Sequence, residues 1–240
     1  MNLDELLQIA AAEPAYRAEF YKHLLEDDLF IVTRNTGLEA GDHTLETEKR
    51  IDIVTFTDGR IPIFTRLERI YDKGIVTEQV EYIQMKGETL LSIAKGATFL
   101  LNPYSDVGKE LTPPEVESLL DGSYLSANAR TSVTQKDTKI MIGQPANYPS
   151  EIVNSLSVLF AAKPEVQAAY LAWFHDPQSG EAPHFLFGID AAGDIQPIIQ
   201  EAGFTVQQFL PENEFADFIQ IDDQALSAYL TNTAPFYKRV

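Results

Sequence analysis

The chain has 240 residues, of which 45% are hydrophobic and 22% are charged, and its formal net charge is −18. This length suits one large domain or two of ordinary size, with enough apolar residues for two cores. The acidic balance repels phosphate groups, so we expect neither nucleic acid nor a membrane surface as a partner. Cysteine is absent, which excludes disulfides, thiolate metal sites and thiol nucleophiles.

The first residues predict two helices and no export signal. Apolar residues recur every three or four positions over 3–12, which predicts an amphipathic helix. Pro14 ends that helix and opens a second one, which buries Phe20 and the leucines after it. Asp4 and Glu5 stand where a signal peptide carries positive charge, and no apolar run approaches the length of a membrane span. We therefore expect a cytoplasmic protein.

A strand and a hairpin are expected next. Leu29–Thr33 is the first predicted strand, and the polar residues 34–48 after it are predicted to form a loop. Ile51–Phe56 and Ile61–Phe64 flank the pair Asp58-Gly59. Because Asp-Gly supplies the positive φ that a tight turn needs, the sequence predicts that these two strands form a β-hairpin.

The rest of the first half is predicted to alternate short helices with strands. The expected elements, in chain order, are a helix over Leu67–Tyr71, a strand over Val80–Met85, a helix over Gly87–Ala94, a strand over Ala97–Leu101 and a helix over Glu115–Leu120. Thr112 precedes two prolines and Glu115, which is typical of a capping box with proline at the first helical position.

A domain boundary is expected near the middle of the chain. Residues 121–137 are polar and lack apolar periodicity, as linkers do. We expect a first domain over 1–122, a linker over 123–135 and a second domain over 136–240. The second half predicts the order β-α-β-β-α-β with an added terminal helix, which is the ferredoxin-like arrangement. The expected fold class is α+β, with a mixed α/β sheet in the first domain.

Sequence motifs for phosphate binding and hydrolysis are missing. Gly108-Lys109 resembles the end of a phosphate-binding loop, but Pro103 stands in place of its first glycine. Glu110 replaces the Ser or Thr that such a loop uses to hold magnesium. The sequence contains no Gly-x-Ser-x-Gly motif either. We expect no cofactor and no enzymatic activity.

Two histidines give the best candidate for a metal site. His175 and His184 flank one predicted turn with Asp176 between them, and they approach each other if the flanking strands pair. Two imidazoles and a carboxylate are suitable zinc ligands. Ordinary turn polarity explains these residues better, and we expect no bound metal.

Small polar and aromatic residues at the ends of the elements form the candidate contact surface. Loops carry binding residues more often than cores do, although strand exits, turn prolines and a packed tail also explain such residues. The candidates are Phe64, Thr65, Asn102, Pro103, Gly108, Lys109, Glu110, Gln144, Pro145, Tyr148, Pro149 and Tyr237.

Six stretches together carry a family resemblance. They are ELLQIAAAEPAYRAEFYKHLLE, PIFT at Pro62–Thr65, FLLNPYSDVGKELTPPEV, GQPANYPSEIVNSLSVLF, FGIDAAGDIQPIIQEAG and APFYKR. With these stretches the chain resembles the enhanced serine sensitivity (SseB) protein family over nearly all of its length. The resemblance implies two family domains and a bacterial protein linked to serine tolerance and amino-acid metabolism. It implies no catalytic residues, and Arg66 stands where the family's Phe-Thr is followed by serine.

These observations favour a bacterial cytosolic protein that binds or regulates without catalysis. Its partner is expected to be another protein or a small metabolite. One alternative is an amino-acid sensor in which the ferredoxin-like half binds the ligand. Another is an enzyme that works without cysteine at a site between the two domains. The sequence leaves the oligomeric state open.

Overall fold

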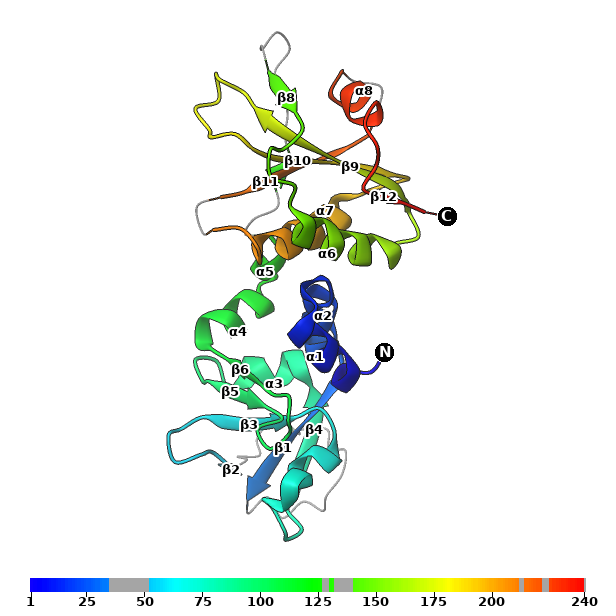
Figure 1. Ribbon diagram of the computed structural model, residues 1–240. Helices are drawn as coiled ribbons and strands as arrows, with labels where there is room; N and C mark the ends of the chain where they lie inside the picture. The colour runs from blue at the N-terminus through cyan, green and yellow to red at the C-terminus, as the bar shows by residue number, and fades with distance from the viewer. Residues whose placement is uncertain (35–51, 127–129, 132–139, 212–213, 222–224, 240) are drawn as a thin grey trace. The chain divides into compact units, whose positions relative to one another are not determined.

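The computed structural model describes residues 1–34, 52–126, 130–131, 140–211, 214–221 and 225–239 (Figure 1). The chain divides into two compact units, Met1–Tyr124 and Leu125–Val240, each built on its own six-stranded sheet. Helices accompany both sheets, which confirms the predicted α+β class with two domains. Most of the predicted loop 34–48 lies outside the described residues.

The division between the units falls inside the segment predicted as a linker. That segment is not devoid of secondary structure, because it contributes the short helix α5 (Ser123–Ser126) and the strand β7 (Arg130–Thr131). Strand β7 pairs in parallel with β11 (Ala216–Gln220) of the second unit. Polar composition concealed this strand, since two residues are too few to show an apolar period.

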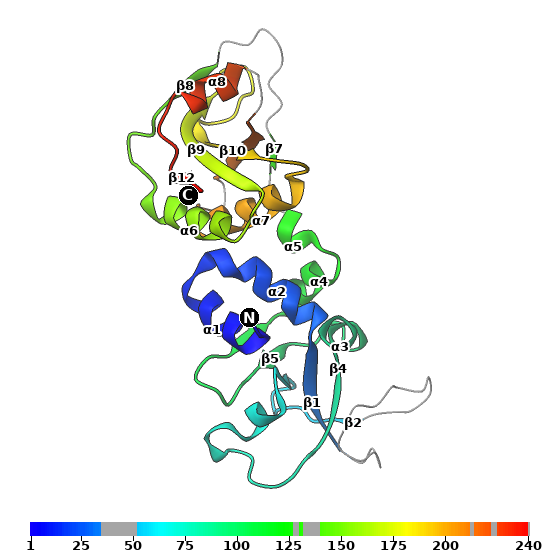
Figure 2. The ribbon, with the colours of Figure 1, turned by 90° about the vertical axis from the view of Figure 1, so that its right-hand side faces the viewer.

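The helices of the first unit pack on one face of its sheet (Figures 1 and 2). They are α1 (Leu3–Ala12), the 3₁₀ turn η1 (Pro14–Tyr16), α2 (Arg17–Glu26), α3 (Gly87–Ile93) and α4 (Pro113–Leu120). Helix α1 starts with a capping box, in which the Asn2 side chain accepts a 2.9 Å bond from the Glu5 amide and the Glu5 carboxylate accepts one from the Asn2 amide. Pro14 ends α1 as predicted.

Strand β1 is the centre of the first sheet. The strands are β1 (Asp28–Arg34), β2 (Asp52–Ile53), β3 (Ile61–Phe64), β4 (Glu81–Lys86), β5 (Phe99–Leu101) and β6 (Lys109–Leu111). Strand β1 pairs antiparallel with β4 along six residues, and the sheet runs on through β3, β5 and β6. A second 3₁₀ segment, η2 (Leu67–Gly74), follows β3.

The predicted hairpin around Asp58-Gly59 is wrong, although the turn itself is present. Gly59 has φ of 85°, and its amide bonds to the carbonyl of Phe56 at 2.9 Å. Strands β2 and β3 both run antiparallel to β1, so they point in the same direction. After β2 the chain turns at Asp58-Gly59 and then returns as β3, so β2 and β3 both pair with β1 and not with each other. Asp-Gly determines the local dihedrals but not which strand each arm pairs with.

The two faces of this sheet have different roles. Leu29 and Ile31 of β1 point toward the helices and belong to the buried core. Because side chains alternate along a strand, Phe30, Val32 and Arg34 lie on the opposite face. Residues of η2 and of the loop after β5 cover part of that face, and a pocket lies there.

The second unit is built around a long antiparallel pair. Strand β9 (Val166–His175) pairs with β10 (His184–Ala191), and β10 pairs in parallel with β11. Strands β8 (Met141–Gly143) and β12 (Tyr237–Lys238) both pair with β9. Helices α6 (Ser150–Ala161) and α7 (Gln196–Gln207) lie on one face of the sheet, and α8 (Ala225–Thr231) lies on the other (Figures 1 and 2).

The ferredoxin-like strand order predicted for this unit is wrong. A split β-α-β unit places another strand between the two that its helix connects. Here β10 and β11, which α7 connects, are direct parallel neighbours, and β8 pairs with β9. The predicted elements occur in the predicted order, with the unpredicted strands β7 before them and β12 after them, but the same order allows more than one pairing of strands.

Among the described helices, none has both the length and the apolar character that crossing a bilayer requires.

Candidate functional site

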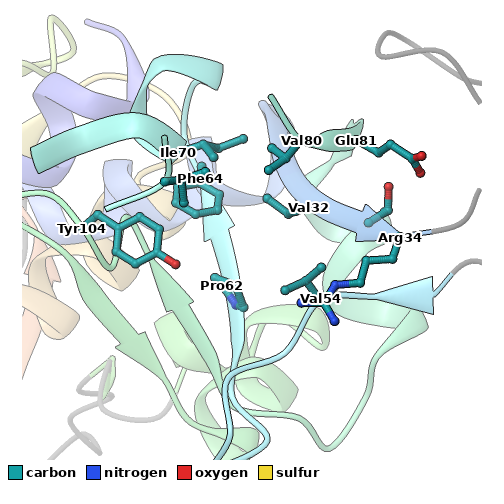
Figure 3. Close-up of a pocket in the computed structure, with 11 residues that line it drawn as sticks. Val32, Arg34, Val54, Pro62, Phe64, Ile70, Val80, Glu81 and Tyr104 are labelled. Carbon is teal, nitrogen blue, oxygen red and sulfur yellow. The ribbon is translucent and has the colours of Figure 1, made fainter. Parts of the chain in front are cut away.

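A pocket of about 440 Å³ opens on the sheet face of the first unit that the helices leave uncovered. Its volume falls within the range of small-molecule sites, roughly 300–1,000 Å³. Most of its wall is apolar and comes from Val32, Val54, Pro62, Phe64, Ile70 and Val80 (Figure 3). The pocket therefore suits an occupant with an apolar body.

Strand pairing puts these walls in place. The Val54 amide donates to the Val32 carbonyl at 3.0 Å, and Phe64 lies opposite Phe30 in the β1–β3 register. Val32 of β1 and Val54, the residue after β2, thus lie on one face of the sheet. Ile70 reaches the pocket from η2 and is fully buried. Residues from distant parts of the sequence are needed to complete the cavity.

Tyr104 forms the side of the pocket opposite Arg34, and its hydroxyl points into the cavity (Figure 3). The Tyr104 ring packs edge-on against Phe56 at 6.2 Å and tilted against Phe64 at 5.8 Å between ring centroids. Burial raises the pKa of Tyr104 above its usual value, so the phenol is a protonated donor at neutral pH. Within the described part of the chain the hydroxyl has no hydrogen-bond partner.

Arg34 supplies a positive charge at the edge of the pocket. Its side chain runs from the end of β1 toward Val54, and Glu81 of β4 also lines the pocket (Figure 3). Glu81 lies opposite Thr33 in the register of β1 and β4, and both residues belong to the pocket lining. The pocket thus combines apolar walls with four polar residues, Arg34, Tyr104, Glu81 and Thr33.

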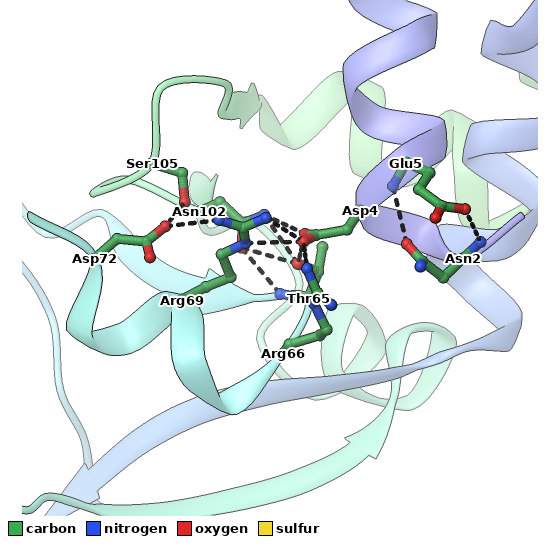
Figure 4. A network of polar contacts seen from close by, with 9 residues as sticks. All are labelled: Asn2, Asp4, Glu5, Thr65, Arg66, Arg69, Asp72, Asn102 and Ser105. Carbon is green, nitrogen blue, oxygen red and sulfur yellow. Dashed lines mark hydrogen bonds and ion pairs between the residues drawn. The ribbon is translucent and has the colours of Figure 1, made fainter.

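A buried polar network supports the loop that carries Tyr104 (Figure 4). Asn102 has φ of 49°, a left-handed conformation that asparagine tolerates better than most residues. Its Oδ1 accepts a bond from the Thr65 amide at 3.0 Å, and its Nδ2 donates to the Thr65 hydroxyl at 2.9 Å. These bonds fix the loop after β5 to the end of β3.

Asp4 is the acceptor at the centre of this network (Figure 4). Its carboxylate is buried and accepts bonds from the Thr65 hydroxyl, from Arg66 and from Arg69, whose Nε lies at 2.8 Å. Burial by itself raises the pKa of Asp4, but the bonds from Arg69, Thr65 and Arg66 outweigh it and lower the pKa to about 2. Asp4 is therefore an anion at neutral pH.

Asp72 extends the network to the loop next to Tyr104. Arg69 donates to Asp72 at 3.0 Å, and the Ser105 hydroxyl donates to the same carboxylate oxygen at 2.5 Å. A polar hollow of about 240 Å³ beside these residues is lined by groups that already pair with one another. We therefore infer that the role of this network is to support the pocket wall.

Comparisons with known proteins match both halves of the chain. The SseB protein N-terminal domain matches residues 3–118, and the SseB protein C-terminal domain matches residues 134–239. Protein SseB of Escherichia coli (strain K12) is 30% identical over 245 residues, which covers 99% of this chain and 92% of that protein. Protein SseB of Shigella flexneri matches with the same identity and coverage. This chain belongs to the SseB family. No solved structure matches it.

Three of the predicted contact residues lie at or behind the pocket of the SseB N-terminal domain. Phe64 lines the pocket, and Thr65 and Asn102 form the network behind it. Pro103 follows Asn102 in the same loop and is half-buried. The sequence drew attention to this loop through Asn102-Pro103, but Tyr104, the residue that reaches the pocket, was not among the candidates.

Gly108, Lys109 and Glu110 lie in or next to β6, away from the pocket lining. A Cβ on Gly108 would lie 2.7 Å from the Leu101 carbonyl oxygen, so this glycine is needed for close packing of backbone and not only for a turn. Glu110 pairs with Arg60 at 3.2 Å.

The Lys109 side chain pairs with residues of α4 and α2. Its Nζ lies 2.9 Å from the Glu115 carboxylate and 5.6 Å from the centre of the Tyr21 ring. Glu115 also accepts a bond from the Tyr21 hydroxyl at 2.5 Å. The predicted capping box at Thr112 is wrong, because the Thr112 side chain makes no cap bond and Glu115 turns to α2.

The other candidates belong to the SseB C-terminal domain. Gln144 donates to the Leu171 carbonyl at 3.4 Å, and Tyr237 donates to the Phe160 carbonyl at 3.2 Å. Tyr148 is 55% exposed in the segment before α6, which also holds Pro145 and Pro149. None of these five lines the pocket of the first unit, so the predicted contact surface divides between the two units.

The two histidines of the C-terminal domain have separate surroundings. His184 bonds to Asp217 at 3.1 Å and to the Ala182 carbonyl at 2.8 Å. The Nδ1 atom of His175 is buried and has no hydrogen-bond partner in the described structure. Nowhere in the described residues do three His, Asp or Glu side chains gather in a way that would hold a metal ion.

Two residues that sequence reasoning missed are central here. Asp4 was noted only as a negative charge that argues against a signal peptide. Asp4 stands three residues before Leu7, on the same apolar face of α1, and this spacing could have indicated that Asp4 is buried. Arg34 was assigned to a loop, and its alternation with Val32 along β1 was the signal that placed it on the pocket face.

Proposed function

We propose that this SseB-family protein is a non-catalytic binding protein that holds a small metabolite in the pocket of its first unit. The observation that supports this most directly is the cavity of about 440 Å³ with largely apolar walls, with Arg34 and Tyr104 at opposite sides and Thr33 and Glu81 also in its lining. A few placed polar groups in an apolar cavity are typical of small-molecule sites.

The groups that face the pocket favour binding over turnover. Partial burial raises the pKa of the Tyr104 phenol above its usual value of about 10, so Tyr104 is not a useful proton acceptor near neutral pH. The Arg34 guanidinium and the Tyr104 hydroxyl are both good hydrogen-bond donors, which suits them to holding a ligand in place.

The physiological setting is part of the same proposal. We place the protein in the bacterial cytoplasm, where a bound metabolite would regulate it. The family resemblance links the chain to serine tolerance and amino-acid metabolism, so amino acids and their keto acids are the first ligands to test. Two alternatives remain predictions: binding of a protein partner, and enzymatic activity at a site formed by both units.

A thermal-shift screen with a pocket-filling variant tests the proposal. A ligand at 100 times its dissociation constant adds about 2.7 kcal/mol of stability. Val32→Phe puts an aromatic ring into the cavity while keeping a residue that strands favour. We expect a ligand to raise the melting temperature of the native protein and not that of Val32→Phe.

Ile93→Phe is the matched control, because Ile93 is 55% exposed at the end of α3 and outside the pocket lining. It should respond to ligand as the native protein does. The proposal fails if no amino acid, keto acid or other metabolite shifts the native protein. It also fails if Val32→Phe and Ile93→Phe respond alike.

A further inference from the structure

Two charged residues line the pocket, Arg34 and Glu81, and the structure shows no ion pair between them. Arg34 is exposed and forms no ion pair with any residue that the structure describes. Asp52 lies opposite Arg34 in the β1–β2 register, but it does not line the pocket and makes no ion pair with Arg34. Glu81 lines the same pocket without pairing with Arg34 (Figure 3). In a chain of net charge −18, a cation that has no carboxylate partner among the described residues and borders a largely apolar cavity is a distinctive feature.

Guanidinium groups bind carboxylates through two parallel N–H···O bonds. At the edge of the cavity, Arg34 is placed to do this while the remainder of a ligand lies against Val32, Val54 and Phe64. Val32, Val54 and Phe64 offer only hydrocarbon to the ligand, and Arg34 is the one cationic residue among the described residues that line the pocket. Tyr104, on the other side, offers a neutral donor.

From this arrangement we infer that the pocket binds a small carboxylic acid with an apolar body, with its carboxylate on Arg34 and its hydrocarbon part against Val32, Val54 and Phe64. The inference rests on the proposed function and adds the chemical class of the ligand. The Tyr104 hydroxyl donates to a neutral acceptor at the far end of the ligand when one is present. Tyr104 is thus a second contact and does not select for charge.

Matched acids and amides test the inference with the full chain. The probes are 4-methylpentanoate, 3-phenylpropionate and octanoate, each measured beside its primary amide by calorimetry or by ligand-observed NMR. Acid and amide share their shape and differ in charge. We expect the best acid to bind at least tenfold more tightly than its amide.

Arg34 variants assign that preference to one side chain. Arg34→Met keeps the length of the side chain and removes the charge, so it should abolish the preference for acid and leave amide binding within about twofold. Arg34→Lys should restore part of the preference, because the charge returns without the planar fork. Tyr104→Phe is the control, and it should keep the preference for acid.

The outcomes separate this inference from the proposed function. Equal binding of acids and amides, or a preference that Arg34→Met retains, overturns the carboxylate inference while the pocket still binds small molecules. Failure of every probe to bind, together with failure of the metabolite screen, overturns both. A preference for acid that Arg34→Met removes and Arg34→Lys partly restores supports it.

Discussion

The Arg69 guanidinium donates to the buried Asp4 carboxylate over 2.8 Å, although the two residues are 65 positions apart in the sequence. The same guanidinium donates to Asp72 at 3.0 Å. Arg69 therefore ties η2 to the start of α1. This connection, together with Thr65 and Asn102, fixes the loop that presents Tyr104 to the pocket.

Replacing Asp4 should destabilise the first unit. Asp4→Ala leaves Thr65, Asn102 and Arg69 without their buried acceptor, and we expect a loss of about 3 kcal/mol in the free energy of unfolding. Urea unfolding followed by far-UV circular dichroism measures it. Asp106→Ala is the control, because Asp106 is 93% exposed where it pairs with Lys73, and it should change nothing measurable. Equal effects of the two substitutions would contradict the role given to Asp4.

Acid should weaken the same network. The pKa of Asp4 is lowered from 3.8 to about 2 by bonds that outweigh its burial, so folding favours the ionised form. A lowered pKa contributes stability that is complete above about pH 4 and is lost as the pH falls toward about 2. We expect the difference in unfolding free energy between the native protein and Asp4→Asn to narrow over this range. A difference that stays constant from pH 5 to 2 would argue against an ionised Asp4.

His184 should give the second unit the opposite pH dependence. Burial alone lowers the pKa of His184, but Asp217 and the Ala182 carbonyl both favour the protonated ring, and the pKa is raised above 6.5. A raised pKa contributes stability that is complete below the unfolded value of about 6.5 and is lost as the pH rises through the folded value. We therefore expect the second unit to become less stable above about pH 6.5.

Trp173 is the only tryptophan of the chain and lies in the second unit, so its fluorescence reports this change. In His184→Gln the decline in unfolding free energy above about pH 6.5 should be absent. His23→Gln, which alters the first unit, should leave the decline intact. Persistence of the same decline in His184→Gln would show that another group causes it.

Gly108 should not tolerate a side chain. A Cβ there would lie 2.7 Å from the Leu101 oxygen and 2.9 Å from the Asn102 oxygen, which are both backbone atoms. Gly108→Ala should therefore cost about 1–3 kcal/mol through backbone displacement. The control is Gly143→Ala, because a Cβ on Gly143 meets nothing within 4 Å. Thermal unfolding compares the two, and a Gly108→Ala variant as stable as Gly143→Ala would disprove the close approach.

Local sequence signals predicted the helices and strands but not their pairing. The period of apolar residues placed the first helix over 3–12, and α1 spans Leu3–Ala12. Asp58-Gly59 predicted a turn, which exists, and a hairpin, which does not. In the second unit the order of elements was right while β8 and β10 took other partners than expected. Pairing depends on which strands meet in the folded sheet, and short-range dihedral preferences do not determine that.

The sequence predicted only part of the candidate site, again because local patterns do not show which distant residues come into contact. Thr65 and Asn102 were singled out because they stand where strands end, and they bond to each other across 37 positions. Asp4 and Arg34 were missed as site residues, because a charged residue at a helix start or a strand end is usually solvated. Their partners and surroundings lie too far away in the sequence for a local pattern to reveal them.

The positions of most elements, the α+β class and the SseB family could be predicted from local sequence patterns, because periodicity, turn residues and motifs act over a few neighbouring positions. The burial of Asp4, the pocket beside Arg34 and Val32 and the closure of that pocket by Tyr104 became visible in the folded chain alone. Burial and charge pairing arise when α1, β1, η2 and the loop after β5 come together. They are properties of contacts between distant residues, which no window of sequence contains.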